Sequence, residues 1–157
     1  MGLVAEYRNA RRAEDVARLR RILALRALAA TGKSQRQIAE ILDITQPAVS
    51  QQLKFAPDLD NVHPEVLLEA AAPVLKTLAA ERGYTRMAVF GSVARHQAHP
   101  TSDIDLLVEA PEATSSFDFV GFKQLLEKVL GREIDLVEYG GLKPTVDDDI
   151  RREAVLL

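Results

Sequence analysis

The segment FAPDLDNVHPE, residues 55–65, is the feature that most limits how this chain of 157 residues can fold. It combines two prolines with the short polar residues Asp58, Asp60 and Asn61, a composition typical of a linker. Continuous regular structure is therefore expected to stop there, which divides the chain into two modules.

The first module is expected over residues 1–56 and the linker over residues 57–63. The second module is expected over residues 64–157. The two parts differ in charge. Residues 1–55 hold 10 Lys and Arg against 5 Asp and Glu, a net charge of +5, whereas residues 56–157 hold 10 against 18, a net charge of −8. This asymmetry favours a basic module that binds a polyanion and an acidic module that holds metal ions, although solvated surfaces also vary by chance.

The composition excludes several classes of site. The chain has no cysteine, which rules out disulfides, thiolate metal sites and cysteine nucleophiles and fits a reducing compartment. No apolar run approaches the roughly 18 residues that a membrane span needs. The N-terminal arginines are not followed by an uninterrupted apolar segment. We therefore expect a cytoplasmic protein that does not engage a membrane.

Three helices are predicted in the first module. Apolar residues recur at helical spacing over residues 14–30, and Gly32 ends that helix. Ser34 and Gln37 form a capping box at the start of a second, short helix. After a tight connection, Thr45 caps a third helix. This module is therefore expected to be all-α.

The second and third predicted helices meet the physical requirements of a helix-turn-helix. Ala39 is small where the two helices approach, and Val49 anchors the later helix to the core. The outward groups have the size and chemistry to read base edges of double-stranded DNA or to neutralise its phosphates. The expected DNA-binding residues are Arg36, Gln46, Ser50, Gln51 and Lys54. A helical hairpin that serves only packing or dimerisation is the alternative.

Helices and strands alternate in the second module. One long helix ends at Gly83, an amphipathic helix ends at Gly131, and a closing helix is expected over residues 146–157. The predicted strands are residues 84–90, 102–109 and 133–138. This order predicts a small α/β domain whose helices cover one face of a mixed sheet, so the fold class of the whole chain is α+β.

A glycine and a serine follow the first predicted strand, where a helix begins. Gly91 lets the backbone approach a ligand closely, and the first turn of a helix presents unpaired N–H groups that bind anionic phosphates. Ser92 adds a hydroxyl group and Arg95 adds a cation. We therefore expect these three residues to bind the phosphates of a nucleotide.

After a gap of ten residues come two aspartates separated by one residue. Asp103 and Asp105 project to the same side of a strand and can share hard divalent cations. Asp135 completes a carboxylate triad if the second and third strands are neighbours. A phosphate cradle beside such a triad is what metal-assisted nucleotidyl transfer needs, because Mg²⁺ or Mn²⁺ bridges the phosphate oxygens and neutralises developing charge.

The pattern of GS, ten residues and DID resembles the DNA polymerase β-type nucleotidyltransferase superfamily, in particular its minimal nucleotidyltransferase (MNT) branch, over residues 64–157. The resemblance implies that Asp103 and Asp105 bind the metal. It also implies that Asp135 is a third ligand or the base toward the acceptor hydroxyl, and that the GS pair contacts the triphosphate. His96 departs from the pattern, because many relatives carry glycine there.

The stretch ITQPAVSQQLK in turn resembles the recognition helices of bacterial repressors, whose turns usually have glycine at the position of Asp43. MNT proteins are known as antitoxins paired with HEPN-domain ribonuclease toxins. The resemblance therefore implies an Mg-dependent antitoxin that transfers AMP from ATP to a tyrosine hydroxyl of its HEPN partner. The fused helix-turn-helix adds binding to the promoter of its own operon for autoregulation.

Three further points stay open at this stage. Symmetric operators and paired helix-turn-helix motifs are compatible with a homodimer. One alternative function is a non-catalytic transcriptional regulator whose nucleotidyltransferase-like domain only binds a nucleotide or the toxin. Another is an enzyme that modifies a small molecule.

Overall fold

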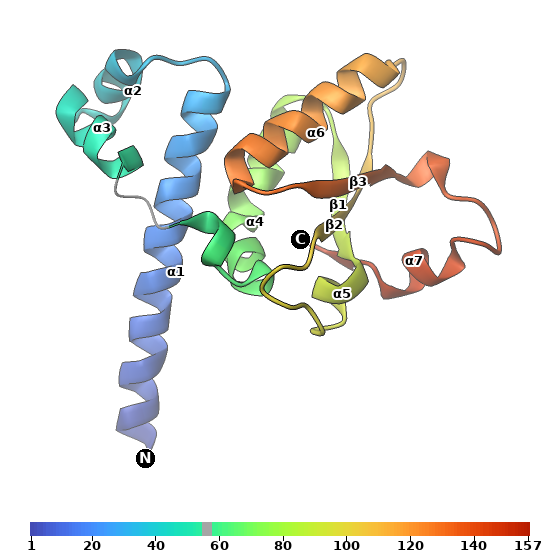
Figure 1. The fold of residues 1–157 in the computed structure, drawn as a ribbon, viewed down its shortest axis with the longest axis horizontal. Coiled ribbons are helices and arrows are strands. Elements are labelled where there is room, and N and C mark those ends of the chain that lie inside the picture. Colours follow the sequence, from blue (N-terminus) through green and yellow to red (C-terminus); the bar gives the residue numbers. More distant parts are fainter. Residues whose placement is uncertain (55–57) are drawn as a thin grey trace.

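The computed structural model describes residues 1–54 and 58–157. Residues 55–57, where the predicted module 1–56 passes into the predicted linker 57–63, lie outside the described residues. Within the described ranges, no helix is both long enough and apolar enough to cross a membrane. The elements in chain order (Figure 1) are α1 (Gly2–Ala30), α2 (Gln35–Leu42), α3 (Gln46–Lys54), η1 (Leu59–Asn61), α4 (Pro64–Glu81), β1 (Thr85–Phe90), α5 (Gly91–Ala94), β2 (Ile104–Glu109), α6 (Ser116–Leu130), β3 (Ile134–Glu138), η2 (Tyr139–Gly141), α7 (Asp148–Glu153) and β4 (Val155–Leu156).

The four strands form one mixed sheet in the order β3-β2-β1-β4. β2 and β3 run parallel, whereas β1 pairs antiparallel with both β2 and β4, which confirms the predicted mixed sheet and α+β class. Ile104, Leu106 and Val108 of β2 point toward α4 and α6 and form part of the large core. On the opposite face Leu107 packs in a smaller cluster with Leu142 from the C-terminal segment.

The predicted closing helix over residues 146–157 is only partly correct. α7 ends at Glu153, and Ala154 is extended, with φ −63° and ψ 133°. Val155 and Leu156 then pair with β1 as the edge strand β4, and the N–H of Leu157 donates to the carbonyl of Met87 at 3.0 Å. The open edge of β1 offers backbone partners that the short apolar tail satisfies better as a strand than as a helix.

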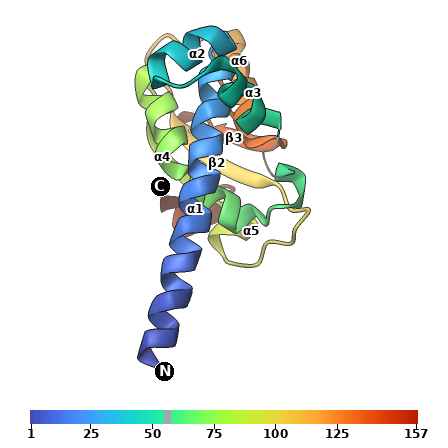
Figure 2. The same cartoon turned by 90° about the vertical axis from the view of Figure 1, so that its left-hand side faces the viewer.

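α1 is longer than the apolar pattern over residues 14–30 predicts, because it begins at Gly2. Residues 2–15 are exposed, so they have no apolar periodicity to detect, but their alanines, arginines and glutamates favour a helix. Figure 2 shows this half extending beyond the rest of the molecule. Further along α1, Leu23 belongs to the large core, whereas Leu25 belongs to the small core of the helix-turn-helix.

The helix-turn-helix forms as expected. Ala39 and Val49 are buried with Ile38 in its small core. The capping box at the start of α2 is present, since the N–H of Gln37 donates to Ser34 Oγ at 3.1 Å and the N–H of Ser34 donates to Gln37 Oε1 at 2.8 Å. The N–H of Ala48 donates to the hydroxyl of its cap residue, Thr45, at 3.2 Å. The predicted start signals therefore match the observed helices.

The two positions at which the resembled patterns were expected to have glycine both have a left-handed backbone. Asp43 at the end of α2 has φ 54°, and His96 after α5 has φ 55°. Both lie in the left-handed region, which favours glycine but which aspartate tolerates better than most residues. His96 is also held by its side chain, because Nδ1 lies 2.8 Å from Glu65 Oε1. Asp43 and His96 thus adopt the left-handed backbone that glycine would adopt without strain, at some cost in strain.

Candidate active site

The parallel pairing of β2 and β3 brings two of the predicted carboxylates together. Asp105 and Asp135 are direct partners in the register, and both lie on the sheet face opposite α4 and α6. Asp103 immediately precedes β2, two residues from Asp105, and is exposed. The condition set by the sequence, that the second and third strands be neighbours, is therefore met.

Gly91 is required by the space around Asp105. Its φ of +74° is left-handed, and a Cβ atom built on it would overlap the carboxylate of Asp105. Phe90, the residue before it, is also the register partner of Asp105 across β1 and β2. Any side chain at position 91 would thus push the carboxylate away or distort the turn into α5.

The carboxylates repel one another electrostatically. The pKa of Asp105 is raised to about 7, with burial as the largest cause; a hydrogen bond with Asp135 and the negative charges of Asp135, Asp103 and Glu153 contribute the rest. Asp105 is half-buried, whereas Asp103 and Asp135 are exposed. A site that concentrates negative charge in this way is suited to a cation or to a proton held between carboxylates.

The predicted phosphate-binding residues are already in contact with a carboxylate from the C-terminal segment. The backbone N–H of Gly91 donates to Glu153 Oε1 at 2.9 Å. The guanidinium of Arg95 donates to Glu153 Oε2 at 2.8 Å, and Arg95 remains about half exposed. Within the described residues no hydrogen bond to the hydroxyl of Ser92 is present. The N–H group and the cation thus hold the carboxylate of Glu153 in the structure, and phosphate binding by these residues stays a prediction.

Glu153 is the residue that sequence reasoning missed. Its contacts join positions that are 58 and 62 residues apart, and no motif or periodicity marks it. The tail was expected to continue as a helix, which would have given Glu153 no particular orientation. The one available signal is that it is the last acidic residue in the sequence, directly before the apolar tail AVLL.

The donor chemistry fits a hard divalent cation, although the side chains are not gathered around one. Among residues 1–54 and 58–157, no group of three or more His, Cys, Asp or Glu side chains converges closely enough to hold a metal ion. Asp103, Asp105 and Asp135 supply only carboxylate oxygens, the ligands that Mg²⁺ prefers. Burial and the neighbouring carboxylates raise the pKa of Asp105. A cation would relieve that repulsion, so the residues fit the group.

The expected DNA-binding residues lie elsewhere, on α2 and α3 near one end of α1 (Figure 1). Arg36 and Gln51 are exposed, and Ser50 is half-buried. The amide of Gln46 donates to Gln35 Oε1 at 2.7 Å, which links α3 to α2. Lys54 forms the last turn of α3. These side chains therefore form a surface separate from the carboxylates.

Comparisons with known proteins agree with this division. Residues 73–157 match the nucleotidyltransferase domain family. Residues 19–55 match the arsR family of bacterial regulatory proteins. The first match includes β1 to β4 and the candidate active site, and the second includes α2, α3 and the part of α1 that packs on them.

Individual relatives match about half of the chain. A protein of Methanocaldococcus jannaschii, assigned as protein adenylyltransferase MJ0435, is 45% identical over 75 residues, which are 48% of this chain and 81% of that protein. Protein adenylyltransferase MntA of Thermococcus cleftensis is 36% identical over 80 residues, 51% of this chain and 81% of that protein.

A solved structure described as that of a minimal nucleotidyltransferase aligns with a TM-score of 0.54 at 39% identity. The alignment covers 59% of this chain and 95% of that one. The family match covers the segment that holds the carboxylates, and the relatives and the solved structure are nucleotidyltransferases by name. The chain belongs to the nucleotidyltransferase family and carries an arsR-type helix-turn-helix ahead of its nucleotidyltransferase domain.

Proposed function

We propose that this protein transfers AMP from ATP to a tyrosine hydroxyl of a HEPN-domain ribonuclease toxin and so acts as its antitoxin. The observation that carries the proposal is the pairing of Asp105 with Asp135 beside the Gly91 turn. The names of the relatives, which describe protein adenylyltransferases, favour a protein acceptor over a small molecule. The tyrosine and the HEPN partner follow from the resemblance to the MNT branch.

The chemical step needs one bond to form and one to break. The acceptor oxygen attacks the α-phosphorus of ATP, the bond from that phosphorus to the oxygen bridging to the β-phosphorus breaks, and pyrophosphate leaves. Asp135 is exposed beside Asp105 and takes the proton of the hydroxyl group. Ser92 and Arg95 bind the triphosphate and orient it for the attack.

A divalent cation would be held by Asp103, Asp105 and Asp135. Mg²⁺ or Mn²⁺ in that place would neutralise charge on the triphosphate and on the leaving pyrophosphate. The same cation would favour the ionised form of Asp105, since a nearby positive charge lowers the pKa of a carboxyl group. Asp103 and Asp105 otherwise serve to bind and orient, whereas Asp135 also takes the acceptor proton, and together the three carboxylates give the domain its requirement for a metal.

The helix-turn-helix in this proposal binds double-stranded DNA of the promoter from which the protein is expressed. Arg36 and Lys54 neutralise phosphates, while Gln46, Ser50 and Gln51 face the major groove. A homodimer would present two such helices to a symmetric operator. The test is a binding assay with promoter DNA at two salt concentrations, because phosphate contacts make affinity fall as salt rises.

One observation favours a second candidate, a regulator that does not catalyse transfer. Glu153 already occupies the N–H of Gly91 and the guanidinium of Arg95, so the groups that would bind phosphate are engaged within the chain. In this case the nucleotidyltransferase domain would only bind the toxin or a nucleotide. The two candidates differ in whether the partner gains mass.

The deciding experiment is intact mass spectrometry of the HEPN-type protein encoded beside this one, after incubation with this protein, ATP and Mg²⁺. The matched control is the double variant Asp103→Ala, Asp105→Ala. A gain of AMP mass that disappears with the variant supports transfer, and peptide mapping then identifies the acceptor residue. Tight binding of the partner without any gain of mass would support the non-catalytic regulator instead.

A further inference from the structure

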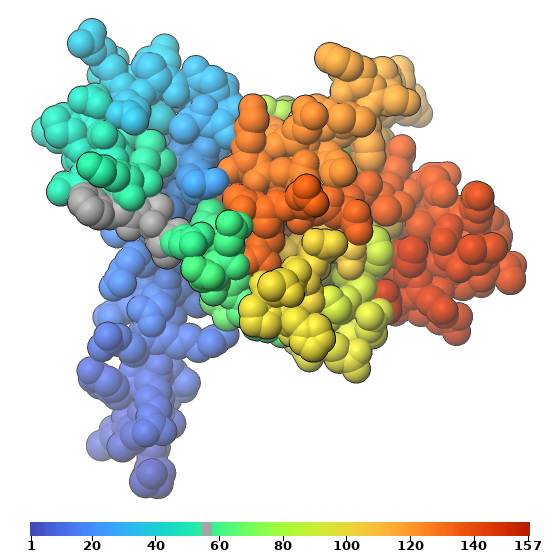
Figure 3. All heavy atoms as spheres, in the orientation of Figure 1, coloured from blue at the N-terminus to red at the C-terminus, as the bar shows by residue number. Residues whose placement is uncertain are grey.

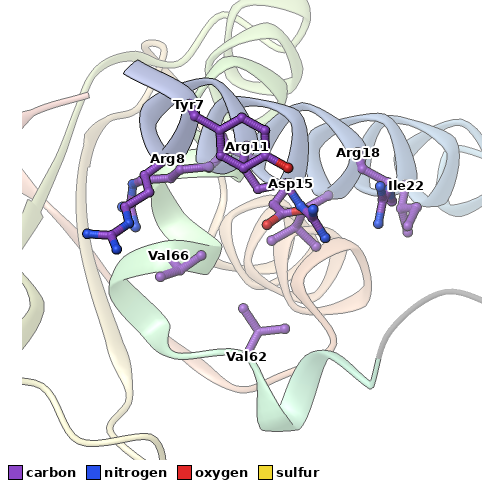
Figure 4. A pocket seen from close by; sticks show the side chains of 11 residues that line it. Tyr7, Arg8, Arg11, Asp15, Arg18, Ile22, Val62 and Val66 are labelled. Atoms are coloured by element: carbon purple, nitrogen blue, oxygen red, sulfur yellow. The ribbon is translucent and has the colours of Figure 1, made fainter. Parts of the chain in front are cut away.

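A groove lies between the N-terminal half of α1 and the corner at which η1 leads into α4. Its volume is about 560 Å³. Figure 4 shows the side chains of α1 on one wall and those of Val62 and Val66 across from them. Val16, Leu19 and Ile22 of α1 add further apolar surface to the lining. The groove is therefore a concave surface with an apolar floor.

Cations surround this floor. Four arginines of α1 line the groove, and one of them, Arg12, is used within the chain because it pairs with Glu69 at 2.8 Å. Across the described parts of the chain, Arg8, Arg11 and Arg18 have no ion pair or hydrogen bond through their side chains. Tyr7 is 69% exposed at the outer end of the groove. Three unpaired arginines beside apolar surface indicate a ligand that is both acidic and apolar.

Two other occupants fit less well. A DNA backbone needs cations but no apolar floor, and no residue of α2 or α3 lines the groove. A second copy paired through α1 would bring like charges together, since this helix carries seven arginines against three acidic residues. A helix with an apolar stripe flanked by Asp and Glu matches both the floor and the cations.

The groove adjoins the candidate active site through the corner at residues 58–65. His63 Nε2 lies 3.1 Å from the carbonyl oxygen of Ala98, in the loop that leads to Asp103. Arg132 donates to the carbonyl of Val62 at 2.8 Å and to that of Ser102 at 3.5 Å. Figure 3 shows α1 projecting past this loop. A protein bound in the groove would therefore contact the corner that holds the loop leading to Asp103.

We propose that this groove docks an acidic amphipathic helix of the acceptor protein and so positions that protein for modification. The inference rests on the proposed function only in identifying the bound protein as the acceptor. α1 then serves both modules: its C-terminal half packs in both cores, and its N-terminal half binds the protein substrate.

The test uses the full chain and a fluorescein-labelled amphipathic peptide of about five helical turns, with leucines on one face and glutamates on both flanks. Fluorescence anisotropy measures its binding, without ATP or metal. We expect Arg8→Glu combined with Arg11→Glu to weaken binding at least about tenfold. The matched control is Arg20→Glu combined with Arg21→Glu, which makes the same charge change on α1 outside this groove and should stay within about twofold. Val62→Ser should also weaken binding, because it makes the floor polar.

Several results would overturn the proposal. These are no binding of the peptide, equal loss in both charge-reversed variants, or equal binding of a twin peptide with lysine in place of glutamate. A wild-type chain that sediments as a dimer, and that Arg8→Glu with Arg11→Glu converts to a monomer, would assign the groove to a second copy instead. Because the peptide carries no acceptor hydroxyl and the assay contains no ATP, its failure is separate from a failure of AMP transfer.

Discussion

The two modules differ in the size of the hydrophobic core that stabilises each of them. The nucleotidyltransferase domain has a sheet covered by α4 and α6, and its core includes side chains such as Leu67 and Leu126 that are wholly buried. The helix-turn-helix has a small core in which Leu25 of α1 packs with Ile38 and Val49. The larger domain can therefore hold a cluster of repelling carboxylates, whereas the smaller one depends on a helix that it shares.

The two modules also differ in the kind of strain that each of them contains. In the larger domain the unfavourable feature is electrostatic and lies at the candidate active site, where burial raises the pKa of Asp105 to about 7. In the smaller domain the unfavourable feature is the left-handed backbone of Asp43 at the end of α2, a kind of strain that His96 shows in the larger domain as well. Strain that is tied to function should be relieved only with loss of activity, whereas strain in a connection should be relieved without loss.

The largest effect is expected at Asp105. Asp105→Asn removes the charge that burial and Asp135 oppose, and with it a ligand for the cation, so AMP transfer should fall at least about 100-fold. The metal-free protein should become more stable at neutral pH. Intact mass spectrometry measures the transfer, and thermal unfolding measures the stability. The control is Glu138→Gln, at the other end of β3, which should change neither quantity strongly.

The pH dependence of stability tests the same charge. The pKa of Asp105 is raised from 3.8 to about 7 on folding, so the folded state binds its proton more tightly. The stabilisation is complete below pH 3.8 and is lost as pH rises through about 7. Asp105→Asn should remove this part of the pH dependence, and Mg²⁺ should reduce it in the wild type. A wild-type stability that does not differ from that of the variant across this range would contradict the raised pKa.

The shared helix gives the next largest effect. Leu23→Ala, at a wholly buried position in the large core, should lower the free energy of unfolding by about 2–5 kcal/mol. Because Leu23 lies on α1, DNA binding should weaken as well. Val49→Ala, in the small core, should cost less and should reduce DNA binding while AMP transfer is unchanged. Chemical denaturation with both activity assays checks this, and loss of transfer in Val49→Ala would mean that the modules are not separable.

Much of this architecture could be predicted from the sequence because it depends on local or regular patterns. The capping box of Ser34 and Gln37 is local, and the alternation of apolar residues along β2 and β3 set which face each aspartate occupies. The pairing of Asp105 with Asp135 needed one assumption, that two strands are neighbours. Contacts that depend on the path of the tail, such as those of Glu153, had no local pattern to predict them.

The exposed start of α1 and the edge strand β4 also could not be predicted from the sequence. The apolar periodicity over residues 14–30 detects only helix that packs on a core, and residues 2–15 are exposed. β4 is two residues long, and it exists because β1 has an open edge, which is a property of the whole sheet. Sequence reasoning thus located the carboxylates but could not show what binds beside them.

A moderate effect on the KM for ATP is expected when Glu153 is changed. If it positions Arg95 and the Gly91 N–H for phosphate, Glu153→Gln keeps an acceptor for the N–H but loses the ion pair, so KM for ATP should rise several-fold with a smaller change in kcat. If the carboxylate instead competes with phosphate for these groups, KM for ATP should fall. Steady-state kinetics of AMP transfer separates the two outcomes. Arg152→Gln, which removes an exposed neighbouring charge, is the control.

The smallest effects, on stability, are expected at Asp43 and His96, the two left-handed positions where the resembled patterns were expected to have glycine. Asp43→Gly relieves a left-handed backbone at the end of α2 and should stabilise the helix-turn-helix by about 1 kcal/mol, with DNA binding retained. His96→Gly should gain less, because it also removes the contact between His96 Nδ1 and Glu65 Oε1. Thermal unfolding of each variant gives the comparison, and Thr45 supplies a control, since Thr45→Ala removes a helix cap and should destabilise. If Asp43→Gly destabilises the protein, the aspartate side chain contributes more stability at this turn than its left-handed backbone costs. The strain at Asp43 would then be tied to the role of the small module, as the charge of Asp105 is tied to the role of the large one.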